Sequence, residues 1–363
     1  MTHDEQSRRD ASVTLAPRRG IFLKQGGALQ SARVAASFYG RDFADAPTIL
    51  VCHALTGSSR IDQWWGDVLG PGKLLDTDRY CIACMNAIGS CYGSTGPSSL
   101  APDGKPWNER FPTVTVEDMV AAQRDALALL GIHRLAIVMG GSLGGQQALQ
   151  WGRAFPDSVG GVVAVGATGR LSPMGIGLNH IAREAIRIDP VEGLRLARMI
   201  GMLSYKSATL LWRRHGRKPD RTSHPNDPKF DVEGYLDHQG DKLAARMDPA
   251  SYTYLSKAMD LYDLDPAGWR VPALLVGIDS DWLYPPDEVE QTARRLAPHA
   301  RFARFESDHG HDGFLADAAQ LTSIVKPFID TRVVDSDVAR RCSTPSAARR
   351  IHENATSAPN ETA

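Results

Sequence analysis

The sequence predicts an α/β fold with a doubly wound, mostly parallel β-sheet and a helical insertion in the second half of the chain. Short apolar runs alternate with longer amphipathic segments, which is the pattern of consecutive β-α units. Most of these runs are continuously apolar, as expected of parallel strands that are covered on both faces. The alternation stops between about residues 169 and 268, where apolar residues take helical spacing.

Six apolar runs are the predicted strands of this sheet: residues 47–52, 80–85, 135–139, 161–165, 273–278 and 301–305. Two segments between them have the spacing of amphipathic helices. Residues 116–130 are followed by Gly131, a residue typical of helix C-termini. Residues 144–155 are followed by Pro156, which cannot continue a helix.

Composition separates the sheet domain from an insertion and two tails. Residues 19–168 and 269–330 form the predicted core. Residues 169–268, which are rich in Arg, Met, Tyr and Leu, are predicted to form a helical lid over the strand ends. Residues 1–18 and 331–363 carry few large apolar side chains, so we expect both to be disordered tails.

Charge and hydropathy argue against several classes of protein. The chain has 363 residues of which 42% are hydrophobic, enough to bury a substantial core. A net charge of -1 gives no general attraction to nucleic acid or to anionic membranes. The N-terminus lacks the apolar segment of a signal peptide, and no run reaches the roughly 18 apolar residues of a membrane span. We therefore expect a cytoplasmic protein.

The five cysteines fit a reducing compartment. Cys81 and Cys84 have the spacing of a redox or zinc pair, but they lie inside an apolar run and no second pair of ligands accompanies them. We interpret them as buried strand cysteines and predict no metal site.

The strongest motif is the segment 140–145, GGSLGG, between a predicted strand and a predicted helix. A G-x-S-x-G sequence in this context is the nucleophile elbow of an α/β-hydrolase fold. Glycines on both sides of Ser142 let neighbouring backbone pass without a clashing Cβ atom. The helix that follows directs backbone N–H groups at a developing oxyanion. Ser142 is therefore the predicted nucleophile rather than a passive turn residue.

A serine nucleophile needs a base and an orienting acid, which follow in the chain order Ser, Asp, His in this fold. Asp279 and Asp281 follow one predicted strand, and His309 and His311 follow the next. These residues alone leave both choices open. His53, after residues 47–52, is a further histidine near a strand end.

The loop that contains His53 is better suited to another task. Its sequence, HALTG at residues 53–57, is typical of a loop that donates the second oxyanion N–H group. We expect the backbone N–H groups of Leu55 and Leu143 to form the oxyanion hole.

Long motifs over about residues 19–328 resemble the homoserine O-acyltransferase family, which includes the acetyltransferase of methionine synthesis and its succinyl-specific relatives. The segments that carry the resemblance are residues 52–57, 64–80, 93–107, 111–120, 140–145, 197–205, 232–240, 280–286 and 308–315. The resemblance implies Ser142 as nucleophile, Asp281 as acid and His311 as base. It also implies a homodimer.

The same resemblance implies that Arg198, Tyr205 and Asp312 bind the amino-acid substrate. A guanidinium suits an α-carboxylate and a carboxylate suits an α-ammonium group. The implied reaction is a ping-pong transfer of an acetyl group from acetyl-CoA to L-homoserine, without a cofactor other than the acyl-CoA co-substrate.

Two departures from the family pattern affect substrate identity more than mechanism. Leu143 stands where many acetyl-specific members have Met, and some succinyl-specific members share the Leu. After residues 189–190 the lid lacks a glycine-containing insert that is common in the family. Succinyl-CoA as donor, and an esterase or thioesterase on the same fold, are therefore the alternatives. Serine as acceptor fits less well. A non-catalytic binding relative fits least, because no triad residue is missing.

Overall fold

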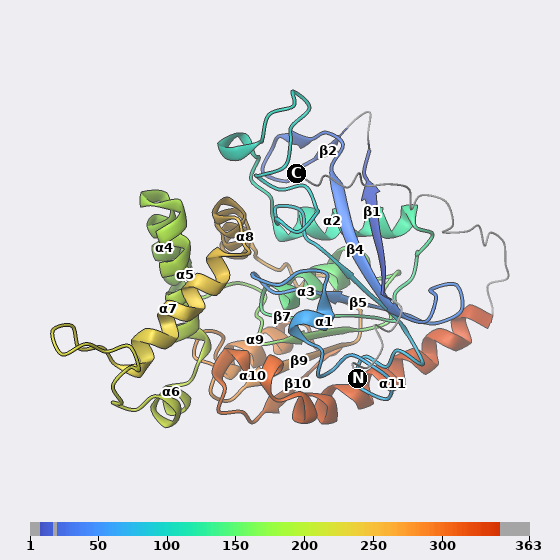
Figure 1. Ribbon diagram of the computed structural model, residues 1–363. Helices are drawn as coiled ribbons and strands as arrows, with labels where there is room; N and C mark the ends of the chain where they lie inside the picture. Colours follow the sequence, from blue (N-terminus) through green and yellow to red (C-terminus); the bar gives the residue numbers. More distant parts are fainter. Residues whose placement is uncertain (1–7, 17–19, 342–363) are drawn as a thin grey trace, which may run out of the picture.

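An eight-stranded mixed sheet forms the centre of the molecule (Figure 1). The structure, a computed structural model, describes residues 8–16 and 20–341. The strand order is β1-β4-β6-β5-β7-β8-β9-β10; β1 and β4 are antiparallel to their neighbours, and the other strands run parallel. The strands are β1 (Arg9–Thr14), β4 (Arg33–Gly40), β5 (Thr48–Cys52), β6 (Cys81–Met85), β7 (Ile137–Gly141), β8 (Val162–Val165), β9 (Ala273–Ile278) and β10 (Ala300–Phe305). The short strands β2 (Ile21–Phe22) and β3 (Ala28–Leu29) pair separately.

The α/β-hydrolase fold class predicted from the sequence is confirmed by this sheet and its helices. The six predicted strands correspond to β5 to β10, with limits that differ by no more than two residues. Strands β5 to β9 are buried along their full length, which explains their continuously apolar sequences.

The prediction of a disordered N-terminal tail over residues 1–18 is wrong for residues 9–14. These residues form β1, which pairs antiparallel with β4 from Arg9 opposite Phe38 to Thr14 opposite Arg33. As an edge strand, β1 alternates between half-buried and exposed side chains, so its sequence is as polar as that of a tail. Residues 1–7 and 17–19 lie outside the described part of the chain.

The predicted start of the C-terminal tail at residue 331 is also wrong. Helix α11 (Ala318–Arg341) continues ten residues beyond it. Ile329 and Val333 are buried against the sheet. This burial stabilises the helix beyond residue 331. The rest of the predicted tail, residues 342–363, lies outside the described residues.

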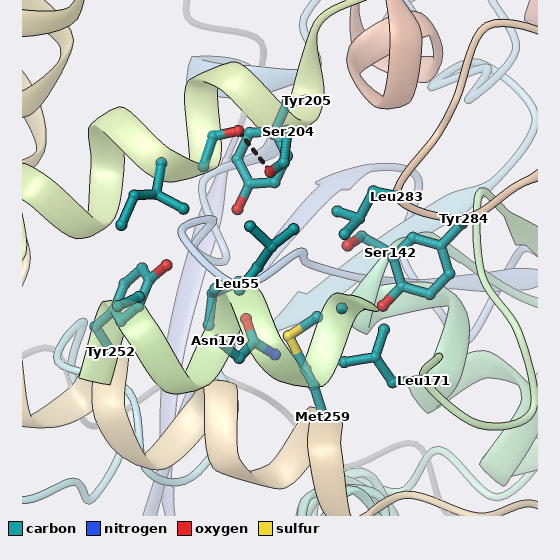
Figure 2. Close-up of a pocket in the computed structure, with 15 residues that line it drawn as sticks. Leu55, Ser142, Leu171, Asn179, Ser204, Tyr205, Tyr252, Met259, Leu283 and Tyr284 are labelled. Atoms are coloured by element: carbon teal, nitrogen blue, oxygen red, sulfur yellow. Dashed lines mark hydrogen bonds between the residues drawn. The ribbon is translucent and has the colours of Figure 1, made fainter. Parts of the chain in front are cut away.

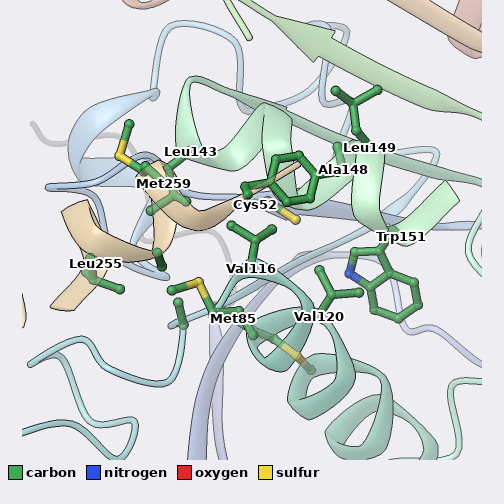
Figure 3. Close-up of a cluster of buried hydrophobic side chains, with 14 of the residues drawn as sticks. Cys52, Met85, Val116, Val120, Leu143, Ala148, Leu149, Trp151, Leu255 and Met259 are labelled. Carbon is green, nitrogen blue, oxygen red and sulfur yellow. The ribbon is translucent and has the colours of Figure 1, made fainter. Parts of the chain in front are cut away.

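Helices cover both faces of the sheet, as a doubly wound fold requires. On one face lie α2 (Val116–Leu129), α3 (Leu143–Ala154) and α9 (Pro286–Arg295); on the other lie α1 (Ile61–Trp64) and α11. Figure 3 shows part of the first face, where Val120 of α2 and Trp151 of α3 belong to one apolar cluster. Each face thus has its own hydrophobic core.

Cys81 and Cys84 confirm the interpretation as buried strand cysteines. Both lie in β6, but Cys81 faces one core and Cys84 the other, so the two thiols point to opposite faces of the sheet. Burial raises the pKa of Cys81 to about 12 and that of Cys84 well above its ordinary value. Across residues 8–16 and 20–341, no cluster of three His, Cys, Asp or Glu side chains could hold a metal ion.

Five helices occupy the segment that the sequence predicts as a lid, and Figure 1 shows them gathered at one end of the sheet. They are α4 (Pro173–Ile188), α5 (Pro190–Tyr205), α6 (Ala208–Arg214), α7 (Asp231–Ala244) and α8 (Pro249–Leu261). A nearly buried ion pair of 2.6 Å between Arg183 and Asp260 joins α4 to α8. No helix in the described part of the chain is both long and apolar enough to cross a membrane.

Candidate active site

Ser142 occupies a sharp turn between β7 and α3. Its backbone angles are φ 57° and ψ -127°, a conformation that is strained for any residue with a side chain. A Cβ atom on Gly144 would lie 2.1 Å from the carbonyl oxygen of Cys52, and one on Gly140 would lie 2.5 Å from the backbone of Gly144. Gly140 and Gly144 are therefore required by close packing of α3 against the end of β5.

A histidine and an aspartate form a buried pair beside this turn. The Nδ1 atom of His311 lies 2.7 Å from Oδ2 of Asp281, and their side chains are 3% and 0% exposed. The other carboxylate oxygen of Asp281 accepts hydrogen bonds of 2.9 Å from the backbone N–H groups of Leu283 and Tyr284. The carboxylate is thus fixed in one orientation, with a single oxygen left for the imidazole.

Several contacts bring this pair and Ser142 to the same edge of the sheet. The backbone N–H of Ser142 donates to the carbonyl oxygen of Val165 over 3.0 Å. A Cβ atom on the next residue, Gly166, would lie 3.2 Å from Nδ1 of His311 and 3.3 Å from Oδ2 of Asp281. The elbow and the pair therefore adjoin across the end of β8.

Aromatic rings enclose the imidazole of His311. Tyr284 stacks on it with ring centroids 5.1 Å apart, Phe314 meets it edge-on at 5.8 Å, and Tyr205 of the lid lies at 5.7 Å. Burial lowers the pKa of His311, but the charge and hydrogen bond of Asp281, aided by Asp312, outweigh it and raise the pKa above its ordinary value. The Nε2 atom is buried and has no hydrogen-bond partner among the described residues.

The other candidates for the acid and the base have different partners. Asp279 pairs with Arg304 at 3.1 Å, and His309 lies 4.0 Å from Asp317. His53 is fully buried, with Nδ1 2.8 Å from the carbonyl oxygen of Ala54 and Nε2 3.0 Å from the backbone nitrogen of Ala87. Burial lowers its pKa, and both ring nitrogens are already engaged, so His53 fixes the loop and has no nitrogen left for Ser142.

Both residues expected to donate oxyanion N–H groups lie near Ser142. Leu143 is the first residue of α3, and Leu55 lines the same cavity as Ser142 (Figure 2). No hydrogen bond joins either N–H group to another described residue. Both donors are thus left for an oxygen atom bound at the turn.

The side chain of Gln147, which the sequence analysis missed, connects the loop that contains Leu55 with the start of α3. The Nε2 atom of Gln147 donates to the carbonyl oxygen of His53 over 3.2 Å and to that of Leu143 over 3.4 Å. The side-chain oxygen of Gln147 accepts a hydrogen bond from the side-chain amide of Gln123. The side-chain oxygen of Gln123 in turn accepts one from the indole N–H of Trp151. Its place one helical turn after the elbow is the only signal in the sequence for this role.

Two of the predicted substrate-binding residues meet in the lid. The guanidinium carbon of Arg198 lies 5.9 Å from the ring centre of Tyr205, which faces His311. Burial raises the pKa of Tyr205, with Asp312 adding to the effect and Arg198 opposing it. The charges of Arg198 and Asp312 therefore both act on this ring.

Asp312 already has a cationic partner. Its carboxylate lies 2.7 Å from Nζ of Lys206, and the two side chains are 18% and 11% exposed. Lys206 follows Tyr205 at the end of α5, and the sequence analysis missed it. An ammonium group of a substrate would therefore share Asp312 with Lys206 or displace it.

The cavity at Ser142 is narrow. It measures about 20 Å³ and is lined by the elbow, by Leu55, by Tyr284 and by side chains of α4, α5 and α8 (Figure 2). That space holds roughly one water molecule. In this conformation the cavity is too small for an amino acid and a thioester together.

Comparisons with known proteins agree with this architecture. The family model described as "alpha/beta hydrolase fold" matches residues 47–318. A homoserine O-acetyltransferase of Symbiobacterium thermophilum is 41% identical, covering 89% of this chain and 94% of its own. One of Moorella thermoacetica is 40% identical, covering 85% of this chain and 93% of its own.

Solved structures agree on the fold and include two activities. The crystal structure of homoserine O-acetyltransferase from Bacillus anthracis has a TM-score of 0.81 at 22% identity and covers 90% of this chain and 99% of its own. That of an esterase has a TM-score of 0.80 at 22% identity and covers 89% and 100%. The fold alone therefore does not separate transfer from hydrolysis. The matched domain and the two relatives at about 40% identity show that this chain belongs to the homoserine O-acetyltransferase family of α/β-hydrolase-fold proteins.

Proposed function

We propose that this protein transfers an acetyl group from acetyl-CoA to the hydroxyl of L-homoserine and so produces O-acetyl-L-homoserine for methionine biosynthesis. The observation that carries the proposal is the buried His311–Asp281 pair beside a strained serine at an elbow covered by a helical lid. The names of relatives that are about 40% identical support the donor and the acceptor.

In the first half-reaction His311, held by Asp281, takes the proton from the Ser142 hydroxyl as its oxygen attacks the thioester carbon. The N–H groups of Leu55 and Leu143 bind the oxyanion that forms. The carbon–sulfur bond then breaks, the CoA sulfur takes the proton from His311, and an acetyl ester remains on Ser142.

In the second half-reaction the homoserine hydroxyl attacks the acetyl-serine ester. His311 accepts the hydroxyl proton and returns it to the Ser142 oxygen as the ester bond to the enzyme breaks. Arg198 and Tyr205 in the lid, with Asp312 beside the base, bind the amino acid in this proposal. Water must be kept out, and the narrow cavity beneath the lid supports such exclusion.

A single assay tests the reaction and its rivals. The purified enzyme is offered acetyl-CoA or succinyl-CoA, with homoserine, with serine or with water alone, and release of free thiol is followed. Rapid release that needs both acetyl-CoA and homoserine supports the proposal. Release without an amino acid would identify an esterase or thioesterase, and a preference for succinyl-CoA would identify a succinyltransferase, which the Leu at position 143 keeps in consideration.

The nucleophile has its own test. Ser142→Ala should abolish acyl transfer while the melting temperature stays close to that of the wild type, and intact-mass spectrometry of the wild type with acetyl-CoA should find one added acetyl group. An active Ser142→Ala variant would refute the proposal.

Two further proposals concern the assembly and the location of the protein. We propose a homodimer, because large apolar side chains stand exposed on the lid helices; among them are Ile181, Ile188, Val191 and Trp212. Light scattering coupled to gel filtration measures the mass of the assembly. We also propose a cytoplasmic location, which fractionation of cells tests directly.

A further inference from the structure

A second cavity, larger and positively charged, adjoins the cavity at Ser142. It measures about 300 Å³, and Arg198, Lys242 and Arg246 line it together with Trp64 and residues 56–58. We call it the basic cavity. Among the described residues that line it, none is an Asp or a Glu. Three cations thus face one space without a carboxylate to balance them.

The cations of the basic cavity are available to a ligand. Asp241, the carboxylate next to Lys242 in the chain, pairs instead with Arg195 at 2.6 Å. Arg246 donates through one nitrogen, Nη1, to the carbonyl oxygen of Thr56 and to the hydroxyl of Tyr92. No ion pair joins Lys242 or Arg246 to an acidic side chain within the described residues, so an anion would be their first charged partner.

Two connections link the basic cavity to the cavity at Ser142. Leu55 lines the Ser142 cavity, and the next residue, Thr56, lines the basic cavity. Arg198 lines the basic cavity while its guanidinium lies over Tyr205, whose ring lines the other. The two cavities therefore lie beside the same loop and the same helix, as the two ends of one long ligand would require.

We propose that Lys242 and Arg246 of the basic cavity bind the phosphorylated nucleotide end of the acyl-CoA donor, while Arg198 binds the amino acid as proposed above. This inference rests on the proposed acyl transfer and adds the subsite that selects the donor. Two cations without an acidic ion-pair partner suit several phosphates better than one carboxylate. The half-buried Trp64 adds an aromatic wall, and aromatic side chains are surfaces on which nucleotide bases stack.

Lys242 is the cleanest residue to change, because Arg246 also holds Thr56 and Arg198 also contacts Tyr205. Steady-state rates of Lys242→Glu are measured with acetyl-CoA and with S-acetylpantetheine, which lacks the phosphates. The ratio of kcat/KM for the two donors should fall roughly tenfold, the usual cost of a lost charged contact. Lys257→Glu, the same charge change at an exposed lysine on α8, should leave that ratio at the wild-type value.

An unchanged ratio in Lys242→Glu would overturn the inference. A rise in the KM for homoserine that exceeds the rise for acetyl-CoA would assign the cavity to the acceptor's carboxylate and would overturn it as well.

A binding measurement separates this inference from the proposed reaction. Adenosine 3′,5′-bisphosphate is titrated calorimetrically into Ser142→Ala and into Ser142→Ala with Lys242→Glu. We expect binding that competes with CoA, weakens with added salt and falls roughly tenfold in the double variant. Bisphosphate binding that depends on Lys242 would uphold the subsite even if no acyl transfer were found. Binding no tighter than that of inorganic phosphate would refute it even in an active transferase.

Discussion

The Nδ1 atom of His311 lies 2.7 Å from Oδ2 of Asp281, while the second oxygen of that carboxylate is held by two backbone N–H groups. Because the aspartate cannot rotate away, the imidazole carries its proton on Nδ1 and presents Nε2 as the basic nitrogen. The pair is buried, so neither group exchanges its partner for water.

Asp281→Asn tests this arrangement. The amide can keep the bonds to the N–H groups of Leu283 and Tyr284, but it no longer selects the tautomer of His311 or stabilises its protonated form. We expect kcat to fall by roughly 10⁴ with little change in KM for either substrate. Initial rates measure the fall in kcat, and urea unfolding checks that the fold persists. A loss below tenfold would mean that Asp281 does not orient the base.

The raised pKa of His311 predicts the acid limb of the pH profile. Only the neutral imidazole can accept a proton, so kcat/KM should increase with pH through the folded pKa, at a midpoint above the ordinary histidine value. The effect on stability has the opposite sign. A histidine with a raised folded pKa stabilises the protein most below its unfolded pKa, and that contribution is lost as pH increases through the folded pKa.

Asp312 and Lys206 should move this limb in opposite directions. Asp312 helps to raise the pKa of His311, so Asp312→Asn should shift the limb to lower pH. Lys206→Gln removes the cation that neutralises Asp312 and should shift it to higher pH. The kcat/KM profiles of both variants give the two midpoints, and shifts of the same sign would contradict this assignment.

The sequence predicted strands β5 to β10 but neither β1 nor β4. Strands β5 to β9 are covered on both faces, so each is a continuous apolar run that stands out from its surroundings. β1 lies at the edge with half of its side chains in solvent, and β4 beside it begins with an exposed Arg and has two Ala and one Ser among its eight residues. Such sequences differ little from those of loops or tails.

The residues of the candidate site also fall into those that the sequence located and those that it missed. Ser142, Asp281 and His311 could be located because each follows a strand and their order in the chain is typical of the fold. Gln147 could not, because its role depends on the carbonyl oxygen of His53, which is 94 residues away in the chain. Lys206 could not be distinguished from an exposed lysine without the position of Asp312.

Gln147 should support catalysis through the oxyanion loops. Gln147→Leu removes the bonds to the carbonyl oxygens of His53 and Leu143 and leaves the amide of Gln123 without its acceptor. We expect a loss of stability of about 1–3 kcal/mol and a fall in kcat of roughly tenfold, since a loosened oxyanion hole stabilises the transition state less. Urea titration and initial rates measure the two effects.

The preceding residue supplies the matched control. Gln146 is fully buried, and neither atom of its amide has a hydrogen-bond partner among the described residues. Gln146→Leu should therefore leave stability unchanged or increase it, and kcat should stay close to the wild-type value. Equal losses in the two variants would indicate general packing rather than support of the two loops by Gln147.

The junction between the lid and the base depends on Gly310. Its φ is +65°, and an added Cβ would lie 2.7 Å from the carbonyl oxygen of Tyr205 and 2.8 Å from the backbone nitrogen of Ser207. Gly268 has a similar φ of +69°, but nothing lies within 4 Å of an added Cβ.

Gly268→Ala should cost only the backbone strain of about 1 kcal/mol. Gly310→Ala should cost more and should also lower kcat, because the end of α5 must move away from the residue before His311. Thermal unfolding and initial rates of the two variants check this difference, and a Gly310→Ala enzyme with wild-type kcat would show that close contact of the lid is not needed to position the base.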